Sequence, residues 1–166
     1  MTKTREVESS TDDNEYAHNI DLDDRVFTVW VAGERFGIPV AHVHTVFMID
    51  EITSVPLAHE AVIGLVNLRG RIVTAVSLRP RLGLAPVIMA RPVAIGIEHR
   101  GEALALVVDA AGDVINIGNG SEIEAPRHIP PARAKLTASV FRMKDGLLSI
   151  LNMDAVFDIH GEKIAA

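Results

Sequence analysis

The chain is organised around residues 52–78, which read ITSVPLAHEAVIGLVNLRGRIVTAVSL. Pro56 suits the first position of a helix because it has no N–H to leave unpaired there, so we expect a short helical turn to begin at this residue. Asn67-Leu68-Arg69-Gly70 follows as a polar turn, since glycine takes positive φ easily. Residues 72–78 are β-branched and apolar, which predicts a strand buried on most of its surface.

Arg69 lies in this turn, between two apolar segments. A charged side chain on a tight turn is exposed and held in place, as contact residues on loops commonly are. The alternative is an arginine whose aliphatic stem lies along the surface of an ordinary β-turn. Spacing alone does not decide between these two interpretations.

The composition indicates a globular protein without cysteine chemistry. A chain of 166 residues buries about 70% of its unfolded surface, so its stability requires neither disulfides nor metal. The absence of cysteine excludes a disulfide framework, a cysteine-ligated zinc site and a thiol nucleophile. No apolar run approaches the roughly 18 residues of a transmembrane helix, and the N-terminus is acidic where a signal peptide is basic. We therefore expect a cytoplasmic protein with no direct membrane insertion.

The net charge of −6 is concentrated at the N-terminus, where residues 1–24 contain eight acidic and two basic side chains. The remainder of the chain is therefore neutral. A segment this charged and this poor in apolar residues does not bury enough surface to offset its ordering entropy. We expect residues 1–22 to form a disordered acidic tail, residues 23–160 to form the folded domain, and residues 161–166 to form a short C-terminal tail.

Short β-rich segments and turn signals follow one another along the domain. Gly33-Glu34 and residues 99–102 indicate hairpins, and Asp145-Gly146 favours a two-residue type I′ turn. Asn152 suits the N-cap of a closing helix. Besides residues 72–78, we expect strands at residues 26–32, 35–40, 42–49, 92–98, 103–109, 113–117, 139–144 and 147–151.

About ten short strands and two short helices predict an all-β fold rather than alternating βαβ units. Residues 79–92 and 122–134 contain several prolines and are expected to be loops. The first of these loops separates two portions with similar strand-turn-strand content. We predict two small β-barrel subdomains packed together, with their boundary in residues 79–92.

Signatures of enzymes and metal sites are absent or weak. The phosphate-binding loop, the dinucleotide-binding glycine motif and the His-Glu-x-x-His motif do not occur. His42 and His44 would share a strand face, but without a third ligand nearby they are better explained as exposed polar residues. Asp109 and Asp113 are more typical of turn and capping roles than of an acid–base pair. We expect no catalysis and no cofactor, and a minor metal-dependent enzyme is the alternative from another class.

Four arginines lie within thirteen residues: Arg69, Arg71, Arg79 and Arg81. No acidic residue occurs between positions 61 and 97. A nucleic-acid binder uses such a cluster, but the domain is neutral. The chain has one tryptophan, Trp30, and one tyrosine, Tyr16, so stacking platforms are missing. A protein-binding surface, in which arginine is enriched, is the better interpretation.

Residues on both sides of the central turn resemble the CheW-like domain family, over about residues 25–159. The residues that carry the resemblance in the first half are Val55-Pro56, Gly64, Asn67-Leu68-Arg69-Gly70, Ile72-Val73 and Leu78-Arg79. Those in the second half are Leu106-Val107-Val108-Asp109, Val114, residues 148–152 and Phe157. The Asn-Leu-Arg-Gly turn in this setting is the most specific part.

The resemblance implies two five-stranded SH3-like barrels around a shared hydrophobic core, and no catalysis. Coupling proteins of this family bridge the cytoplasmic hairpin tip of chemoreceptors to the histidine kinase CheA, which carries a CheW-like regulatory domain of its own. By this resemblance a groove between the barrels holds a receptor helix, and the barrel ends meet the kinase domain. The receptor or kinase contacts that it implies are Asn67, Leu68, Arg69, Gly70, Thr45, Ser54 and Val108.

The chain departs from the usual residues of the family at four positions. Thr45 stands where a glutamate is usual, Ser54 where an arginine is frequent, His59 where there is a second proline, and Ser77 where there is an acid. Such changes alter which partner charges are complementary. We hypothesise a divergent coupling protein with its own receptor or kinase set. The alternative within the family is a coupling protein of a non-flagellar chemosensory pathway that controls surface motility or gene expression.

Overall fold

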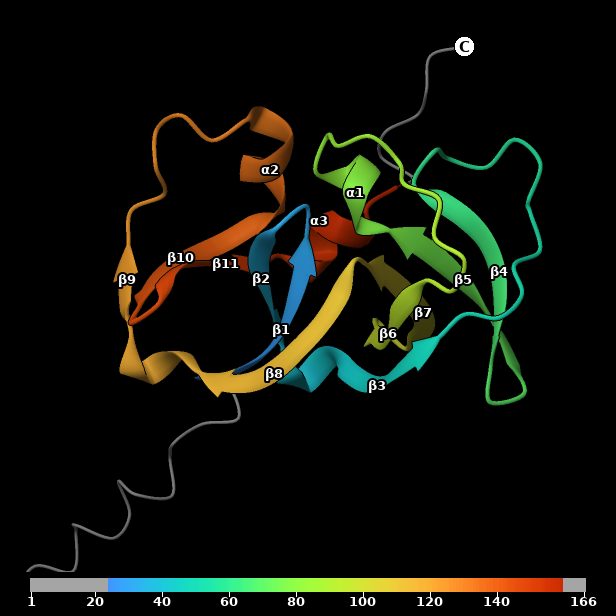
Figure 1. Cartoon of the computed structure of the whole chain (residues 1–166), viewed down its shortest axis with the longest axis horizontal. Helices are drawn as coiled ribbons and strands as arrows, with labels where there is room; N and C mark the ends of the chain where they lie inside the picture. Colours follow the sequence, from blue (N-terminus) through green and yellow to red (C-terminus); the bar gives the residue numbers. More distant parts are fainter. Residues whose placement is uncertain (1–23, 160–166) are drawn as a thin grey trace, which may run out of the picture.

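The computed structural model describes residues 24–159 (Figure 1), so the tails expected at residues 1–22 and 161–166 lie outside the described part. The strands are β1 (Arg25–Val31), β2 (Glu34–Pro39), β3 (Val43–Met48), β4 (Val62–Leu68), β5 (Arg71–Ser77), β6 (Val93–His99), β7 (Glu102–Val108), β8 (Ala110–Asn116), β9 (Ser121–Ile123), β10 (Thr137–Met143) and β11 (Gly146–Leu151). The helices are η3 (Val40–His42), α1 (Leu78–Arg81), η4 (Ile117–Asn119), α2 (Pro131–Leu136) and α3 (Met153–Phe157). The all-β prediction with short helices is confirmed. No helix in residues 24–159 is long and apolar enough to cross a membrane.

The strands form two sheets, which lie side by side in Figure 1. One has six strands in the order β8-β1-β2-β11-β10-β9, and the other has five in the order β3-β6-β7-β5-β4. The pairs β2–β11 and β5–β7 are parallel, and the remaining pairs are antiparallel.

The connection at residues 79–92 is not the boundary between the sheets. Strands β6 and β7 follow this connection and yet pair with β3 and β5. Strands β1 and β2 come first in the chain and pair with β8 and β11 near its end. The expected division was wrong because proline marks where a strand ends, and does not determine which sheet the next strand joins.

Three apolar clusters hold the fold together. The largest contains Val29 and Ile38 of the six-stranded sheet together with Ile95 of the five-stranded sheet, so it is a core shared by both. Each sheet also encloses a smaller cluster of its own. Strand β7 contributes to two cores, since Leu106 faces the shared core while Ala105 faces the smaller one. Side chains alternate between the two faces of a strand, so an unbroken apolar run is buried on both.

Two segments differ locally from the sequence-based prediction. Residues 55–58 form a β-turn instead of a helical turn, and β4 follows as a full strand that includes Asn67 and Leu68. α2 begins within the proline-rich segment expected to be a loop at residues 122–134, with Pro131 at its first position, where the missing N–H is harmless.

Glycine locates three hairpins, although the turn expected at Gly33-Glu34 lies one residue earlier, because Val31 pairs with Glu34. Ala32-Gly33, Arg69-Gly70 and Arg100-Gly101 each have two successive positive φ angles, as a type I′ turn requires. The Asp145-Gly146 prediction was wrong. The register pairs Met143 with Gly146, so the two-residue loop is Lys144-Asp145, and neither of these has positive φ.

Candidate functional site

The turn between β4 and β5 presents Arg69 at the tip of a hairpin. Arg69 has φ 51° and Gly70 has φ 84°. The Gly70 N–H donates to Oδ1 of Asn67 at 2.8 Å, which holds the turn from within. A positive φ costs a non-glycine residue about 1–3 kcal/mol. Arg69 is therefore an exposed side chain on a backbone that is fixed in an unfavourable conformation.

Arg69 also links the two edges of the five-stranded sheet. Its Nη2 donates to Oγ1 of Thr45 on β3, at 3.3 Å. β3 and β4 are the opposite edge strands of this sheet, so the contact means that the sheet curves and brings its two edges close together at the turn. We call these residues the turn surface: Thr45, Asn67, Arg69 and Gly70.

Gly96 on β6 permits this closure. A Cβ at Gly96 would lie 2.8 Å from Cγ2 of Thr45 and 3.3 Å from Cδ2 of Leu68. Both distances are shorter than an ordinary contact between carbon atoms. The absence of a side chain at Gly96 therefore lets β3 and β4 approach each other beneath the turn surface.

Three further contact residues implied by the family resemblance lie elsewhere. Leu68 is half-buried and packs against the small core of the five-stranded sheet. Ser54 is exposed on the connection between β3 and β4, beside Thr53, which pairs with Leu65 of β4. Val108 is only 1% exposed and belongs to the shared core. A side chain buried to this degree does not touch a partner, so Val108 is not part of the surface.

The predicted arginine cluster is divided by the fold. Arg79 donates to the carboxylate of Asp109 from Nε at 2.8 Å and from Nη2 at 2.5 Å. The same carboxylate accepts the Ala32 N–H at 2.8 Å. The hydrogen bond from Arg79 lowers the pKa of Asp109 below its ordinary value of 3.8, and partial desolvation opposes this effect. Arg79 and Asp109 form a structural ion pair, and Asp109 is not placed for acid–base chemistry.

Arg81 is buried. It is 8% exposed, and it donates from Nε to the carbonyl of Val156 at 3.1 Å and from Nη2 to that of Ala155 at 2.8 Å. These carbonyls are near the end of α3, where backbone acceptors lack helical partners. Of the four arginines, Arg69 and Arg71 are the two that stay exposed.

His42 and His44 do not share a strand face as expected, because His42 ends η3 while His44 lies on β3. His44 Nε2 is 2.9 Å from Oε2 of Glu98, and His42 Nδ1 is 3.3 Å from the Glu98 backbone oxygen. Within residues 24–159, no three side chains of His, Cys, Asp or Glu are grouped so as to hold a metal ion.

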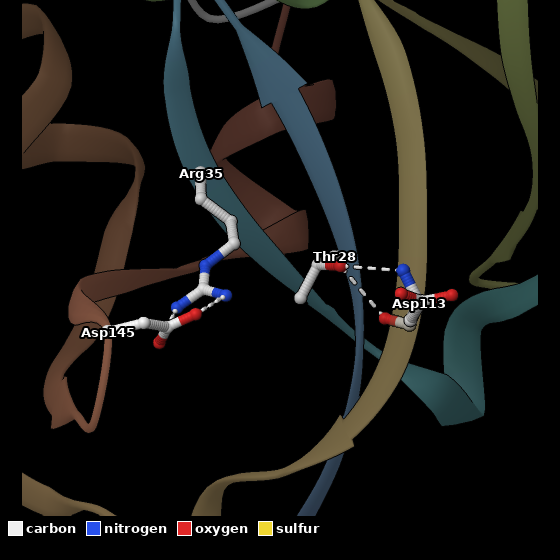
Figure 2. Close-up of polar contacts among 4 residues, drawn as sticks. All are labelled: Thr28, Arg35, Asp113 and Asp145. Carbon is white, nitrogen blue, oxygen red and sulfur yellow. Dashed lines mark hydrogen bonds and ion pairs between the residues drawn. The ribbon is translucent and has the colours of Figure 1, made fainter.

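Asp113 contacts Thr28 through its backbone (Figure 2). The Thr28 hydroxyl donates to the Asp113 carbonyl at 2.9 Å and accepts from the Asp113 N–H at 2.8 Å. A Cβ at the neighbouring Gly112 would lie 2.2 Å from the Thr28 hydroxyl oxygen. These hydrogen bonds join β1 to β8 where their register shifts, so the role of Asp113 seen here is structural.

A groove of about 1100 Å³ lies between the five-stranded sheet and α3. Val62 of β4 and Val76 of β5 line it, and their pairing is at the end of the hairpin opposite the turn. His99 at the end of β6 crosses to α3, with its Nε2 3.1 Å from Oδ1 of Asp154. The family resemblance implies a groove, but local sequence patterns do not identify the residues that line it, because its walls come from segments far apart in the chain.

The family model described as the CheW-like domain matches residues 25–160. The chain belongs to the CheW-like domain family. The matched residues run from the start of β1 to beyond the end of α3, so the turn surface and the groove both belong to the CheW-like domain.

Sequence and structure comparisons with individual proteins support this assignment. The chain is 29% identical over 137 residues to the chemotaxis protein CheW of Bacillus subtilis (strain 168), covering 81% of this chain and 87% of that protein. It is 23% identical over 128 residues to the chemotaxis protein CheW of Rhizobium meliloti (strain 1021), covering 76% of this chain and 83% of that protein. The crystal structure of the scaffolding protein TtCheW from Thermoanaerobacter tengcongensis has the same fold, with a TM-score of 0.72, 24% identity, and coverage of 86% of this chain and 98% of that one.

Proposed function

We propose that this chain is a non-enzymatic adaptor that couples chemoreceptors, the methyl-accepting chemotaxis proteins, to the histidine kinase CheA in bacterial chemotaxis. It acts in the cytoplasm at membrane-associated receptor arrays, through protein contacts alone. Membership of the CheW-like family and the CheW relatives support this proposal. The observation that carries it is the turn surface, where Arg69 is exposed and held by its turn and by Thr45.

In this proposal the receptor engages the turn surface and the groove. The two lie at opposite ends of the β4–β5 hairpin, which at about 3.3 Å per residue separates them by roughly 20 Å. A receptor helix of about fourteen residues spans that distance at 1.5 Å per residue. An apolar helix face in the groove and polar contacts at the turn together make a helix-in-groove complex.

The residue at position 45 sets the charge of this contact. The hydroxyl of Thr45 is neutral, so the hydrogen bond to Arg69 leaves the positive charge of the guanidinium uncompensated there. Arg71, two positions further along the chain, is exposed too. We infer that the turn surface selects an acidic patch on the receptor tip, since complementary charge favours one partner over another.

The test is a titration of Arg69→Asn with a soluble fragment that carries the hairpin tip of a chemoreceptor from the same organism. Asparagine tolerates positive φ and precedes glycine in the favoured type I′ turn, so the hairpin keeps its conformation. We expect the affinity for the receptor fragment to fall about tenfold or more. Affinity for the CheW-like domain of the kinase should stay within about twofold, because that partner binds elsewhere.

Arg71→Asn is the matched control, since it removes an equal charge one residue beyond the turn. A smaller loss for this variant shows that the position of Arg69, and not net charge, supplies the contact. Wild-type affinity for both partners in the Arg69 variant would reject the turn surface as a receptor site. Wild-type protein that binds neither partner would reject the adaptor function as a whole.

A further inference from the structure

Leu57 occupies an unusual position on the connection between β3 and β4. Its side chain is fully exposed, at 105% of the reference value, and its φ is 60°. It is the third residue of the turn at residues 55–58, in which the Ala58 N–H faces the Val55 carbonyl at 3.4 Å and Pro56 is the second residue. A type II turn has positive φ at its third position, where glycine or asparagine is preferred.

Leucine at this position is unfavourable in two ways for the folded chain. An apolar side chain that stays in water gains nothing from burial. A positive φ adds backbone strain that glycine or asparagine avoids. Strain of this kind at an exposed site points to a contact outside the chain, in which the leucine is buried.

The connection below Leu57 is anchored to the sheet. Thr53 and Leu65 of β4 exchange both backbone hydrogen bonds, at 2.9 and 2.8 Å. Gly64 brings the two segments close together, since a Cβ there would lie 2.4 Å from the Thr53 carbonyl oxygen. The connection therefore lies along the outer edge of β4, as Figure 1 shows. Its hydrogen bonds to β4 fix the backbone four residues before Leu57.

The surroundings of Leu57 are apolar and acidic. The side chains of Ile52 and Val55 are partly exposed on the same connection. Glu51 and Glu60 are exposed too, and no lysine or arginine occurs between positions 50 and 68. The complementary surface is an apolar pocket with a basic rim, which differs from the acidic patch that suits Arg69.

We propose that Leu57 is the anchor residue for the kinase, and that it enters an apolar pocket with a basic rim on the CheW-like regulatory domain of CheA. This inference rests on the proposed adaptor function and names a contact within it. When a helix docks, the helix supplies the protruding side chains and the other protein supplies the groove. A receptor helix therefore has no pocket for Leu57, whereas a folded domain does.

The CheW-like fold is able to form such a pocket. On the six-stranded sheet of this chain, a cleft of about 530 Å³ is lined by Trp30, Leu147, Arg35 and Arg133 among others. Trp30 and Leu147 are partly exposed in it. Arg35 is oriented by two hydrogen bonds to Asp145, at 2.7 and 2.9 Å (Figure 2). Asp145 and Glu34 line the cleft as the ion-pair partners of Arg35 and Arg133, so this fold holds paired arginines beside an apolar lining.

The test compares Leu57→Asn and Leu57→Ala by calorimetric titration with the CheW-like domain of the kinase and by thermal unfolding. Both variants remove the anchor, so we expect each to weaken kinase binding at least tenfold. Asparagine also relieves the backbone strain, so Leu57→Asn should raise Tm by about 2–4 °C. Alanine keeps the strain, so Leu57→Ala should leave Tm unchanged. Both variants are therefore expected to lose kinase binding, while only Leu57→Asn gains thermal stability.

Ile88→Asn is the matched control, because Ile88 is 101% exposed and has no positive φ. We expect this variant to keep both wild-type affinity and wild-type Tm. An equal loss of affinity in Ile88→Asn would overturn the proposal, as would an unchanged Tm in Leu57→Asn.

Two further outcomes separate this inference from the adaptor function. If the wild-type chain binds the kinase domain and the Leu57 variants bind it equally well, only the assignment of Leu57 fails. If the wild-type chain does not bind the kinase domain, the proposed function itself fails. Sedimentation of the chain alone tests whether Leu57 instead binds a second copy of this chain. Self-association that is abolished by Leu57→Asn, with kinase binding intact, would mean that the pocket belongs to a second copy and would overturn the proposal.

Discussion

At the scale of single residues, the arginines of the central stretch show how neighbours determine a role. Among residues 24–159, Arg69 donates to the neutral Thr45 hydroxyl and stays exposed. Arg79 meets a carboxylate thirty positions further along the chain, on Asp109. Arg81 is buried against backbone carbonyls. Equal charge and close spacing in the sequence therefore lead to an exposed turn residue, an ion-paired residue and a buried residue.

The Arg79–Asp109 ion pair predicts a pH dependence of stability. The pKa of Asp109 is lowered in the folded protein, chiefly by the hydrogen bond from Arg79. The pair therefore contributes fully above the ordinary aspartate pKa near 4, and its contribution disappears as the pH falls through the lowered value. We expect Asp109→Asn to have a lower Tm than wild type at pH 7 and a difference that shrinks below about pH 4. A difference that is constant from pH 7 to pH 3 would contradict this assignment.

At the scale of elements, the closure of the five-stranded sheet depends on Gly96. Gly96→Ala places a methyl group against Cγ2 of Thr45 and Cδ2 of Leu68. We expect this overpacking to lower the free energy of unfolding by about 1–3 kcal/mol, measured by urea denaturation. Thr45→Ser removes Cγ2 and keeps the hydroxyl, so the double variant should recover at least half of the loss. A double variant no more stable than Gly96→Ala would mean that Thr45 is not the obstacle.

The hairpin turns show what local sequence does and does not specify. Glycine at the second loop position marked the turns at residues 32–33, 69–70 and 100–101, because two positive φ angles are needed there. The same signal misled at Asp145-Gly146, where the pairing of β10 with β11 makes Gly146 the first residue of a strand. Register is set by which side chains reach the core, and a turn dipeptide does not contain that information.

At the scale of the whole molecule, Arg81 ties the connection after β5 to the end of α3. Replacement by methionine keeps the apolar stem and removes both donors. The Val156 carbonyl then loses its bond from Arg81, and the Ala155 carbonyl keeps the longer bond from the Asp158 N–H at 3.3 Å. We expect Arg81→Met to lower the free energy of unfolding by about 2 kcal/mol or more. Arg91→Met is the matched control, because Arg91 forms an exposed ion pair with Asp50 and should cost less than about 1 kcal/mol. Equal costs in urea denaturation would show that the buried hydrogen bonds are not stabilising.

The all-β class, most strand positions and the CheW-like family could be predicted from the amino-acid sequence, as could three glycine turns and the exposure of Arg69. These depend on local patterns, namely alternation, turn chemistry and a short motif. Tertiary structure alone decided that β1 and β2 join the C-terminal strands, that Val108 is buried, that Arg69 meets Thr45, and that Leu57 is fully exposed with positive φ. Strand pairing and burial depend on contacts between residues far apart in the chain, because several apolar faces can pack into the same core. Local sequence patterns do not specify which of these contacts form.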